Sequence, residues 1–293
     1  MLNERDLKGI FVPVVTPFLP NAELDMDSYR NYLGKLVEQE IQGLVINGTT
    51  GEAPTVSWEE VAALVHTTRE CMAGRPNAIP IVIGTGTNDT VSTVKRTEMA
   101  GQLGADAVLV VTPYYSRPSQ EGILEHFRRV AQVGVPVIAY EVPSRTGVRI
   151  TADSMKRIMD LNGVIGLKDS SGGTGLLSEL TRLGTKPVLC GEDLYFHAML
   201  SQGASGGILA SANVNTSAFI QVYRLASEGD LNGARTHFDL LVPLIQRLFQ
   251  ESNPSPLKWL LARQGILSSD TLRLPMGPIT KALQLELERT LPL

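Results

Sequence analysis

Short runs of apolar residues alternate along this chain with longer segments in which apolar residues recur at helical spacing. The apolar runs are continuous and do not alternate with polar positions, which is typical of parallel strands covered on both faces. The pattern predicts eight strands: Gly9–Thr16, Gly43–Asn47, Ile79–Gly84, Ala107–Thr112, Pro136–Val142, Val164–Lys168, Pro187–Gly191 and Gly206–Ser211.

The amphipathic segments between these runs predict helices that cover the strands. Clear examples span Asp27–Glu40, Ser57–Ala73, Thr90–Gly104 and Gln120–Gln132. Ser57 is followed three residues later by Glu60, which is the spacing of a capping box at a helix N-terminus. Eight strand–helix units close naturally into a (β/α)8 TIM barrel. The competing architecture, a doubly wound open sheet, would want a G-x-G-x-x-G turn, and the chain has none.

After Ser211 the chain becomes helical and does not return to strand. The helical segments are Asn213–Ser227, Leu231–Phe249, Ser255–Arg263 and Pro278–Arg289. The first of them completes the eighth strand–helix unit, so about three extra helices follow the barrel. We therefore predict an α/β barrel domain at residues 1–228 and a C-terminal helical appendage at residues 229–293.

The composition excludes some classes of function. The 293 residues have a net charge of −4 and no cluster of Lys and Arg, which argues against binding to nucleic acid. The N-terminal stretch has no apolar signal core, and no apolar run reaches the length that spans a membrane. These features predict a soluble cytoplasmic protein.

The active site of a (β/α)8 barrel lies at the carboxyl ends of its strands, so the residues there are the candidates for chemistry. Polar groups follow most of the predicted strands, and the sixth strand ends in a lysine, Lys168. The polar segments are "NGTTGE" (47–52), "GTGTND" (84–89), "TPYYSRP" (112–118), "YEVPSRTG" (140–147), "CGED" (190–193) and "ASAN" (210–213).

A lysine at the end of an apolar strand raises a chemical question, because burial favours the neutral form of an amine. A neutral amine attacks a keto group and forms a Schiff base, whose iminium then withdraws electrons from the adjacent carbon. The alternative is that Lys168 extends to solvent from the strand end or pairs with a neighbouring carboxylate such as Asp169. Position alone leaves both interpretations open.

Schiff-base chemistry also needs a proton donor and acceptor, and a 2-keto acid needs a site for its carboxylate. Tyr140 ends the strand beside that of Lys168 and is suited to move protons, although such a tyrosine is also a common packed aromatic. The "GTTGE" segment offers hydroxyls and backbone N–H groups to a carboxylate. It is equally explained as a plain turn before the helix that Ser57 caps.

Taken together, these segments resemble the dihydrodipicolinate synthase / N-acetylneuraminate lyase family of Schiff-base class I aldolases. The resemblance covers nearly the whole chain and rests on motifs that occur in the family's order: "GIFVPVVTPF", "GTTGE", "TPYYSRPSQEG", "YEVPSRTG", "GLKDSSG", "CGEDLYF" and "DTLRLPMGPIT".

The resemblance assigns roles to particular residues. It implies that Lys168 binds pyruvate covalently and that Tyr140 donates and accepts protons beside it. Thr49 would link Tyr140 to Tyr115, which would reach into the site of a neighbouring subunit across a tight dimer. Further implied contacts to the keto acid come from Thr50, Gly191 and Ile208, the last two through backbone groups. The family is commonly a homotetramer built as a dimer of dimers, and no cofactor or catalytic metal is implied.

Arg145 is the residue that helps to identify the second substrate. In the synthase branch of the family this arginine grips the carboxylate of aspartate semialdehyde, which condenses with pyruvate to 4-hydroxy-tetrahydrodipicolinate on the route to diaminopimelate and lysine. The alternative within the family is an aldolase or dehydratase that acts on a hydroxylated 2-keto acid. A catalytically idle barrel that only binds a partner is a third possibility, against which the joint presence of Lys168, Tyr140, Thr49 and Tyr115 argues.

Two departures from the synthase pattern concern specificity and regulation. Glu141 stands where synthases often have asparagine, and "LKDSSG" replaces their common "IKEATG". Both variants resemble the broader, functionally mixed part of the family, and they concern the second substrate and not the Schiff base. The helix after "GTTGE" contains Trp58 and Val61 where lysine-inhibited synthases have polar residues. We therefore predict weak or absent feedback inhibition by lysine.

Overall fold

The computed structural model describes residues 1–74 and 79–289, and its eight parallel strands close into a barrel in chain order. The (β/α)8 fold with C-terminal helices is thereby confirmed. The strands are β1 (Gly9–Pro13), β2 (Gly43–Ile46), β3 (Ile81–Gly84), β4 (Ala107–Val111), β5 (Val137–Glu141), β6 (Val164–Asp169), β7 (Val188–Cys190) and β8 (Gly206–Ile208).

The α-helices alternate with these strands and then continue alone. They are α1 (Met26–Val37), α2 (Trp58–Met72), α3 (Thr90–Gln102), α4 (Gln120–Ala131), α5 (Pro143–Thr146), α6 (Ala152–Met159), α7 (Gly175–Leu183), α8 (Phe196–Ser201), α9 (Thr216–Ser227), α10 (Leu231–Leu248), α11 (Ser255–Arg263) and α12 (Lys281–Glu288). The predicted capping box is present, because Ser57 accepts from the Glu60 N–H while the Glu60 side chain accepts from the Ser57 N–H.

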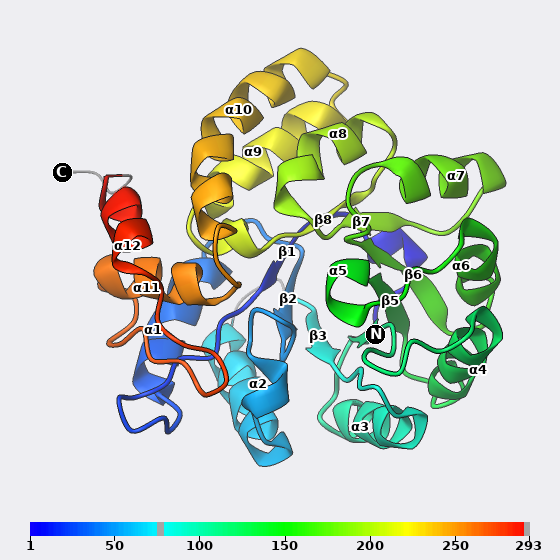
Figure 1. The fold of residues 1–293 in the computed structure, drawn as a ribbon, viewed down its shortest axis with the longest axis horizontal. Coiled ribbons are helices and arrows are strands. Elements are labelled where there is room, and N and C mark those ends of the chain that lie inside the picture. The colour runs from blue at the N-terminus through cyan, green and yellow to red at the C-terminus, as the bar shows by residue number, and fades with distance from the viewer. Residues whose placement is uncertain (75–78, 290–293) are drawn as a thin grey trace. The chain divides into compact units, whose positions relative to one another are not determined.

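The chain divides into two compact units, each built from two separate segments. The first unit comprises Met1–Phe11 and Pro80–Leu209, and it contains strands β3–β8 together with most of β1. Every adjacent pair from β3 to β8 is parallel, and β8 pairs with β1. Figure 1 shows α3, α4, α6 and α7 following one another along the outer side of β3–β6.

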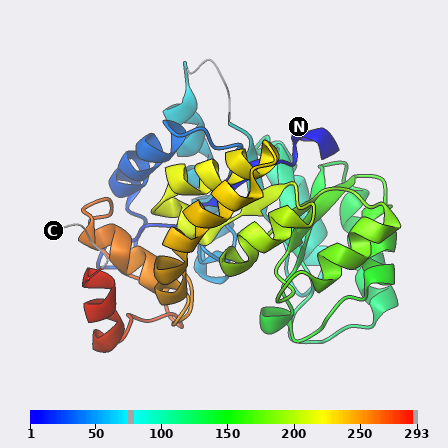
Figure 2. The same cartoon turned by 90° about the horizontal axis from the view of Figure 1, so that it is seen from above.

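The second unit comprises Val12–Ile79 and Ala210–Leu293. Helices α1 and α2 pack together here, and α10 packs on α9, α11 and α12. Figure 2 shows α9 and α10 lying side by side, with α11 and α12 following at the red end of the chain. The predicted boundary between residues 228 and 229 falls in the turn between α9 and α10. That boundary stays a prediction, and its second segment ends in residues 290–293, which lie outside the described residues.

The strands are buried over nearly their whole length, which explains why the sequence shows continuous apolar runs. All five residues of β1, all five of β5 and all six of β6 are buried, including Lys168 and Asp169 at the end of β6. Titratable groups are therefore buried at the carboxyl ends of two neighbouring strands, because Glu141 ends β5 in the same way. Across residues 1–74 and 79–289, the helices all fall short of the length and apolar character needed to cross a membrane.

Candidate active site

Lys168 and Tyr140 lie side by side at the carboxyl ends of two neighbouring strands. The register of β5 on β6 pairs Tyr140 with Lys168 directly. Only 6% of Lys168 is exposed, and its Nζ lies 4.2 Å from the centroid of the Tyr140 ring. None of the ion pairs among the described residues involves Lys168. The structure thus brings together the two residues that the sequence placed at the centre of the chemistry.

Gly191, directly after β7, makes room for the lysine side chain. A Cβ atom at this position would lie 2.8 Å from both Cγ and Cε of Lys168 and 2.3 Å from Ser170 Oγ. Any larger residue would therefore displace the lysine. The Gly191 N–H donates to the Asp169 carbonyl oxygen at 2.8 Å, so a backbone contact to substrate would fall to the Gly191 carbonyl. Ile208 ends β8 next to Phe11 of β1 and is buried.

A pair of buried carboxyl groups, Glu141 and Asp169, lies on the opposite face of the same two strands. The register pairs Glu141 with Asp169, one position beyond Tyr140 and Lys168, and successive side chains of a strand point to opposite faces. Burial raises the pKa of Glu141 to about 7, and the charge of Asp169 adds to this effect. Burial also raises the pKa of Asp169, whose Oδ2 has no hydrogen-bond partner among the described residues.

The raised pKa of Glu141 predicts a pH dependence of stability. Between pH 4.5 and about 7 the folded chain keeps a proton that the unfolded chain has released, so the free energy of unfolding falls as pH rises through this window. The full loss is about 3 kcal/mol at 1.36 kcal/mol per pKa unit. Glu141→Gln removes this titration. Urea unfolding from pH 4.5 to 7.5 should therefore show wild type losing about 3 kcal/mol more than the variant, whereas parallel pH curves would contradict the assignment.

Arg145 and Tyr115 lie in segments that follow β5 and β4. Arg145 belongs to the single turn α5, which ends at Gly147 with a φ of 73°, and its side chain is exposed. Tyr115 is 90% exposed and has a φ of 73°, a conformation that non-glycine residues rarely adopt. A strained backbone that presents an aromatic side chain to solvent is consistent with the predicted role at a subunit contact, which stays a prediction.

Thr49 and Thr50 lie in the second unit, in the turn that follows β2. The turn closes through hydrogen bonds from Gly51 N and Ala53 N to the Gly48 carbonyl oxygen. Thr50 is buried, and its Oγ1 accepts a hydrogen bond from Asn253 Nδ2 at 3.1 Å. Because that bond uses the hydroxyl oxygen as acceptor, the Thr50 hydroxyl proton is available for another acceptor.

Glu52, the last residue of this turn, forms an ion pair with Lys258 of α11 that is inaccessible to solvent. Lys258 Nζ lies 2.7 Å from Glu52 Oε1 and donates to the Thr16 carbonyl oxygen at 2.9 Å. The exposed fraction of the Lys258 side chain is 0%. Glu52 has a φ of 56°, and its Oε2 accepts from the Arg273 N–H at 3.2 Å. Two segments from the C-terminal part of the chain therefore hold this turn.

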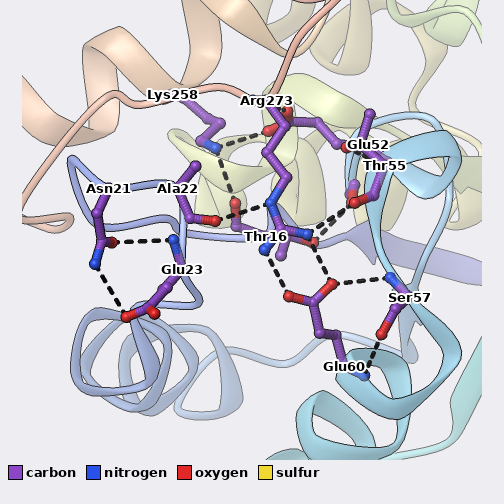
Figure 3. Close-up of polar contacts among 11 residues, drawn as sticks. Thr16, Asn21, Ala22, Glu23, Glu52, Thr55, Ser57, Glu60, Lys258 and Arg273 are labelled. Atoms are coloured by element: carbon purple, nitrogen blue, oxygen red, sulfur yellow. Dashed lines mark hydrogen bonds and ion pairs between the residues drawn. The ribbon is translucent and has the colours of Figure 1, made fainter.

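Figure 3 shows Arg273 beside this pair, joining the turn to the start of α2. Its guanidinium donates to both carboxylate oxygens of Glu60 and to the carbonyl oxygens of Thr55 and Ala22. Our interpretation of the sequence missed this network, because it treated Ser255–Arg263 only as one of the helices that follow the barrel. A signal was present in "PLKWLL", where Lys258 stands alone among apolar residues.

The fold and the residues at its strand ends define a (β/α)8-barrel enzyme with a buried lysine beside a tyrosine. In the described ranges, no group of three or more His, Cys, Asp or Glu side chains could hold a metal ion. Residues 6–292 match the model of the Dihydrodipicolinate synthetase family, and the chain belongs to that family.

Named relatives and solved structures agree with this membership. The chain is 40% identical over 282 residues to 4-hydroxy-tetrahydrodipicolinate synthase of Thermomicrobium roseum, covering 94% of this chain and 91% of the relative. The solved structure of the synthase of Methylacidiphilum fumariolicum SolV matches with a TM-score of 0.92 at 36% identity, covering 97% and 94% of the two chains. The synthase of Acinetobacter baumannii, solved in complex with pyruvate, matches with a TM-score of 0.91 at 35% identity, covering 97% of each chain.

Proposed function

We propose that this chain is a lyase that condenses pyruvate with aspartate semialdehyde to 4-hydroxy-tetrahydrodipicolinate, a step towards diaminopimelate and lysine. The observation that supports this most strongly is Lys168 itself, a buried lysine at a strand end with its Nζ over the Tyr140 ring. Family membership over residues 6–292 supplies the reaction class. The reaction needs no added cofactor, because the lysine itself provides the electron-withdrawing group once it is bound to the substrate.

Lys168 Nζ attacks the keto carbon of pyruvate, and loss of water from the resulting carbinolamine leaves an iminium ion. The iminium allows a proton to leave the pyruvate methyl group, and the enamine so formed attacks the aldehyde carbon of the second substrate. The amino group of the second substrate then displaces the lysine at the imine carbon, which closes the ring of the product and restores the free lysine. The Tyr140 hydroxyl supplies and takes up the protons of these steps, and the Tyr140 ring lies 4.2 Å from the lysine Nζ.

The remaining residues bind the two substrates. The Thr50 hydroxyl donates to the pyruvate carboxylate, and Gly191 and Ile208 contact the keto acid through backbone groups. Arg145 binds the carboxylate of the aldehyde with its guanidinium. Thr49 links Tyr140 to Tyr115, which comes from a neighbouring subunit in a homotetramer built as a dimer of dimers. The protein acts in the cytoplasm.

The test combines a borohydride trap with a turnover assay. Reduction with borohydride in the presence of pyruvate should leave a pyruvyl adduct on Lys168, identified by peptide mass spectrometry. Turnover of aspartate semialdehyde is followed by coupling to a reductase. An adduct with turnover supports the proposal, and an adduct without turnover moves the assignment to another aldolase or dehydratase. The absence of any adduct would contradict the Schiff-base mechanism.

One observation favours a second candidate, an aldolase or dehydratase that acts on a hydroxylated 2-keto acid. Ser170 is 8% exposed, and its Oγ has no hydrogen-bond partner among the described residues. Both this hydroxyl and Lys168 Cε lie against the position of a Gly191 Cβ, at 2.3 and 2.8 Å. A buried hydroxyl without a partner beside the lysine stem is suited to bind a substrate hydroxyl.

A substitution at Ser170 separates the two candidates. If the substrate is a hydroxylated 2-keto acid, Ser170→Ala should lower kcat/KM for it by about 10-fold, the value of one hydrogen bond to a buried group. Pyruvate trapping on Lys168 should stay within twofold. The matched control is Ser171→Ala, because the adjacent Ser171 is bonded to Asp169 through its backbone N–H, which alanine keeps. If Ser170→Ala leaves kcat/KM for hydroxylated keto acids unchanged, the second candidate loses its support.

A further inference from the structure

The segment between β5 and α6 that contains Arg145 is closed at both ends by one buried carboxyl group. Glu141, the last residue of β5, accepts a hydrogen bond at Oε1 from the Ile150 N–H at 2.9 Å. The residues between these two, Val142–Arg149, form a short excursion that includes α5. Glu141 is 0% exposed, and Ile150 is also buried. Both ends of the excursion are thus joined in a place that water does not reach.

The second oxygen of Glu141 connects this closure to the backbone of Tyr140. Glu141 Oε2 lies 3.0 Å from Thr112 Oγ1, which in turn lies 3.1 Å from the Tyr140 carbonyl oxygen. A hydroxyl group has a single proton, so Thr112 cannot donate to both oxygens at once. When Glu141 is protonated it donates to Thr112, and Thr112 donates to Tyr140, which satisfies every group. Glu141 is therefore bonded both to the Arg145 segment and to the strand end that contains Tyr140.

The guanidinium of Arg145 depends on this backbone for its position. Among the described residues, its side chain makes no hydrogen bond and no ion pair, and its backbone N–H donates to the Val142 carbonyl oxygen. An exposed arginine without partners loses conformational freedom when it binds a carboxylate. The backbone that bears it must then be fixed if binding is to be strong.

We propose that Glu141 is a positioning residue for the second substrate: by closing the segment Val142–Arg149 it holds Arg145 where the carboxylate of the aldehyde binds. The inference rests on the proposed function, because it takes Arg145 as the group that binds the aldehyde. Glu141 lies on the face of the strands opposite to Lys168 and touches neither substrate. It acts on the binding of the second substrate and leaves the chemistry at Lys168 to other groups.

Methionine at this position keeps the side-chain volume and removes both hydrogen-bonding oxygens. Glu141→Met should raise KM for aspartate semialdehyde by about 10-fold, the effect of losing a hydrogen bond to a buried acceptor. KM for pyruvate, and the rate of borohydride trapping on Lys168, should change less than twofold. Glu141→Gln keeps an acceptor for Ile150 and a donor for Thr112, so it should restore a KM near that of wild type.

A double-mutant cycle with Arg145 shows whether Glu141 acts through that residue. Arg145→Ala should raise the aldehyde KM by itself, and adding Glu141→Met should raise it no further. The matched control is Asp169→Asn, a buried carboxyl paired in register with Glu141 whose hydrogen bonds go to Ser171. In the double variant Asp169→Asn with Arg145→Ala, the fold-increases in the aldehyde KM caused by the two single substitutions should multiply.

The outcomes separate the inference from the proposed function. If wild type shows no pyruvyl adduct or no turnover of the aldehyde, the proposed function fails. Suppose that wild type forms the adduct and turns over the aldehyde. If the effects of Glu141→Met and Arg145→Ala on the aldehyde KM then multiply, or if Glu141→Met raises the pyruvate KM as much as the aldehyde KM, Glu141 is a purely structural residue and the inference is wrong. Should Glu141→Met not fold, Glu141→Asp provides the test. It withdraws the carboxyl group by one methylene and should raise the aldehyde KM alone by about threefold.

Discussion

Lys168→Met is expected to abolish the pyruvyl adduct and to lower turnover on the order of 10⁴-fold, as the loss of a covalent catalytic group does elsewhere. Methionine keeps the length of the side chain and its packing against Gly191 but has no amine to attack the keto carbon. The trap is read by mass spectrometry of the peptide that contains residue 168, and turnover is read in the coupled assay.

A second lysine near the same strand provides the control. Lys186 donates at 2.6 Å to the carbonyl oxygen of Val164, which is the first residue of β6. Lys168 lies four residues further along, near the carboxyl end. Lys186→Met should leave the adduct on Lys168 and reduce turnover by less than threefold. An adduct on any other lysine in the Lys168→Met protein would contradict the assignment of the nucleophile.

Lys258→Met is expected to lower the free energy of unfolding by about 3–5 kcal/mol, because it leaves Glu52 buried without its cation. Lys258 and Glu52 are both inaccessible to solvent, so water cannot replace the lost partner. The loss is measured by urea unfolding at pH 7, with the denaturant midpoint and slope compared with those of wild type.

The double variant Lys258→Met with Glu52→Gln distinguishes a lost ion pair from lost packing. Removing the second charge should restore about half of the lost stability or more, since a buried pair costs much of its attraction in desolvation. If the double variant is less stable than Lys258→Met alone, the uncompensated charge of Glu52 is not the cause. An exposed pair, Arg235 and Asp239 of α10, serves as the control, and Arg235→Met should cost less than about 1 kcal/mol.

The sequence predicted the fold well because its signal is periodic. All eight strands and the helices between them follow from continuous apolar runs that alternate with amphipathic segments. The predicted strand bounds were less accurate where buried residues lie beyond the hydrogen-bonded part of the strand. The predicted strand Gly206–Ser211 ends at Ile208, because Ala210–Asn213 forms a buried 3-10 turn. Apolar content alone does not distinguish such a turn from a strand.

The two lysines mark the limit of prediction at the site. Lys168 and Lys258 both interrupt apolar segments, and for each of them one asks why a lysine stands in an apolar setting. For Lys168 the barrel rule placed the side chain at the active-site end of the strands, and the family resemblance then assigned its role. No comparable rule applied to Lys258, whose partner Glu52 lies 206 residues away. A single ion pair between residues so far apart in the chain leaves no periodic pattern in the sequence. The bond from Glu141 to Ile150 escaped prediction for the same reason.

The hydrogen bond between Asn253 and Thr50 has a consequence for how the protein folds during its synthesis on the ribosome. These residues are 203 positions apart, and Glu52 meets Arg273 only 221 positions later. At about 5–20 residues per second, roughly 10–40 s pass between the synthesis of the "GTTGE" turn and that of the residues that fix it. A nascent chain stalled before Asn253 therefore has the turn without its supports. Nascent chains of this length are the ones for which we expect the greatest need of chaperones.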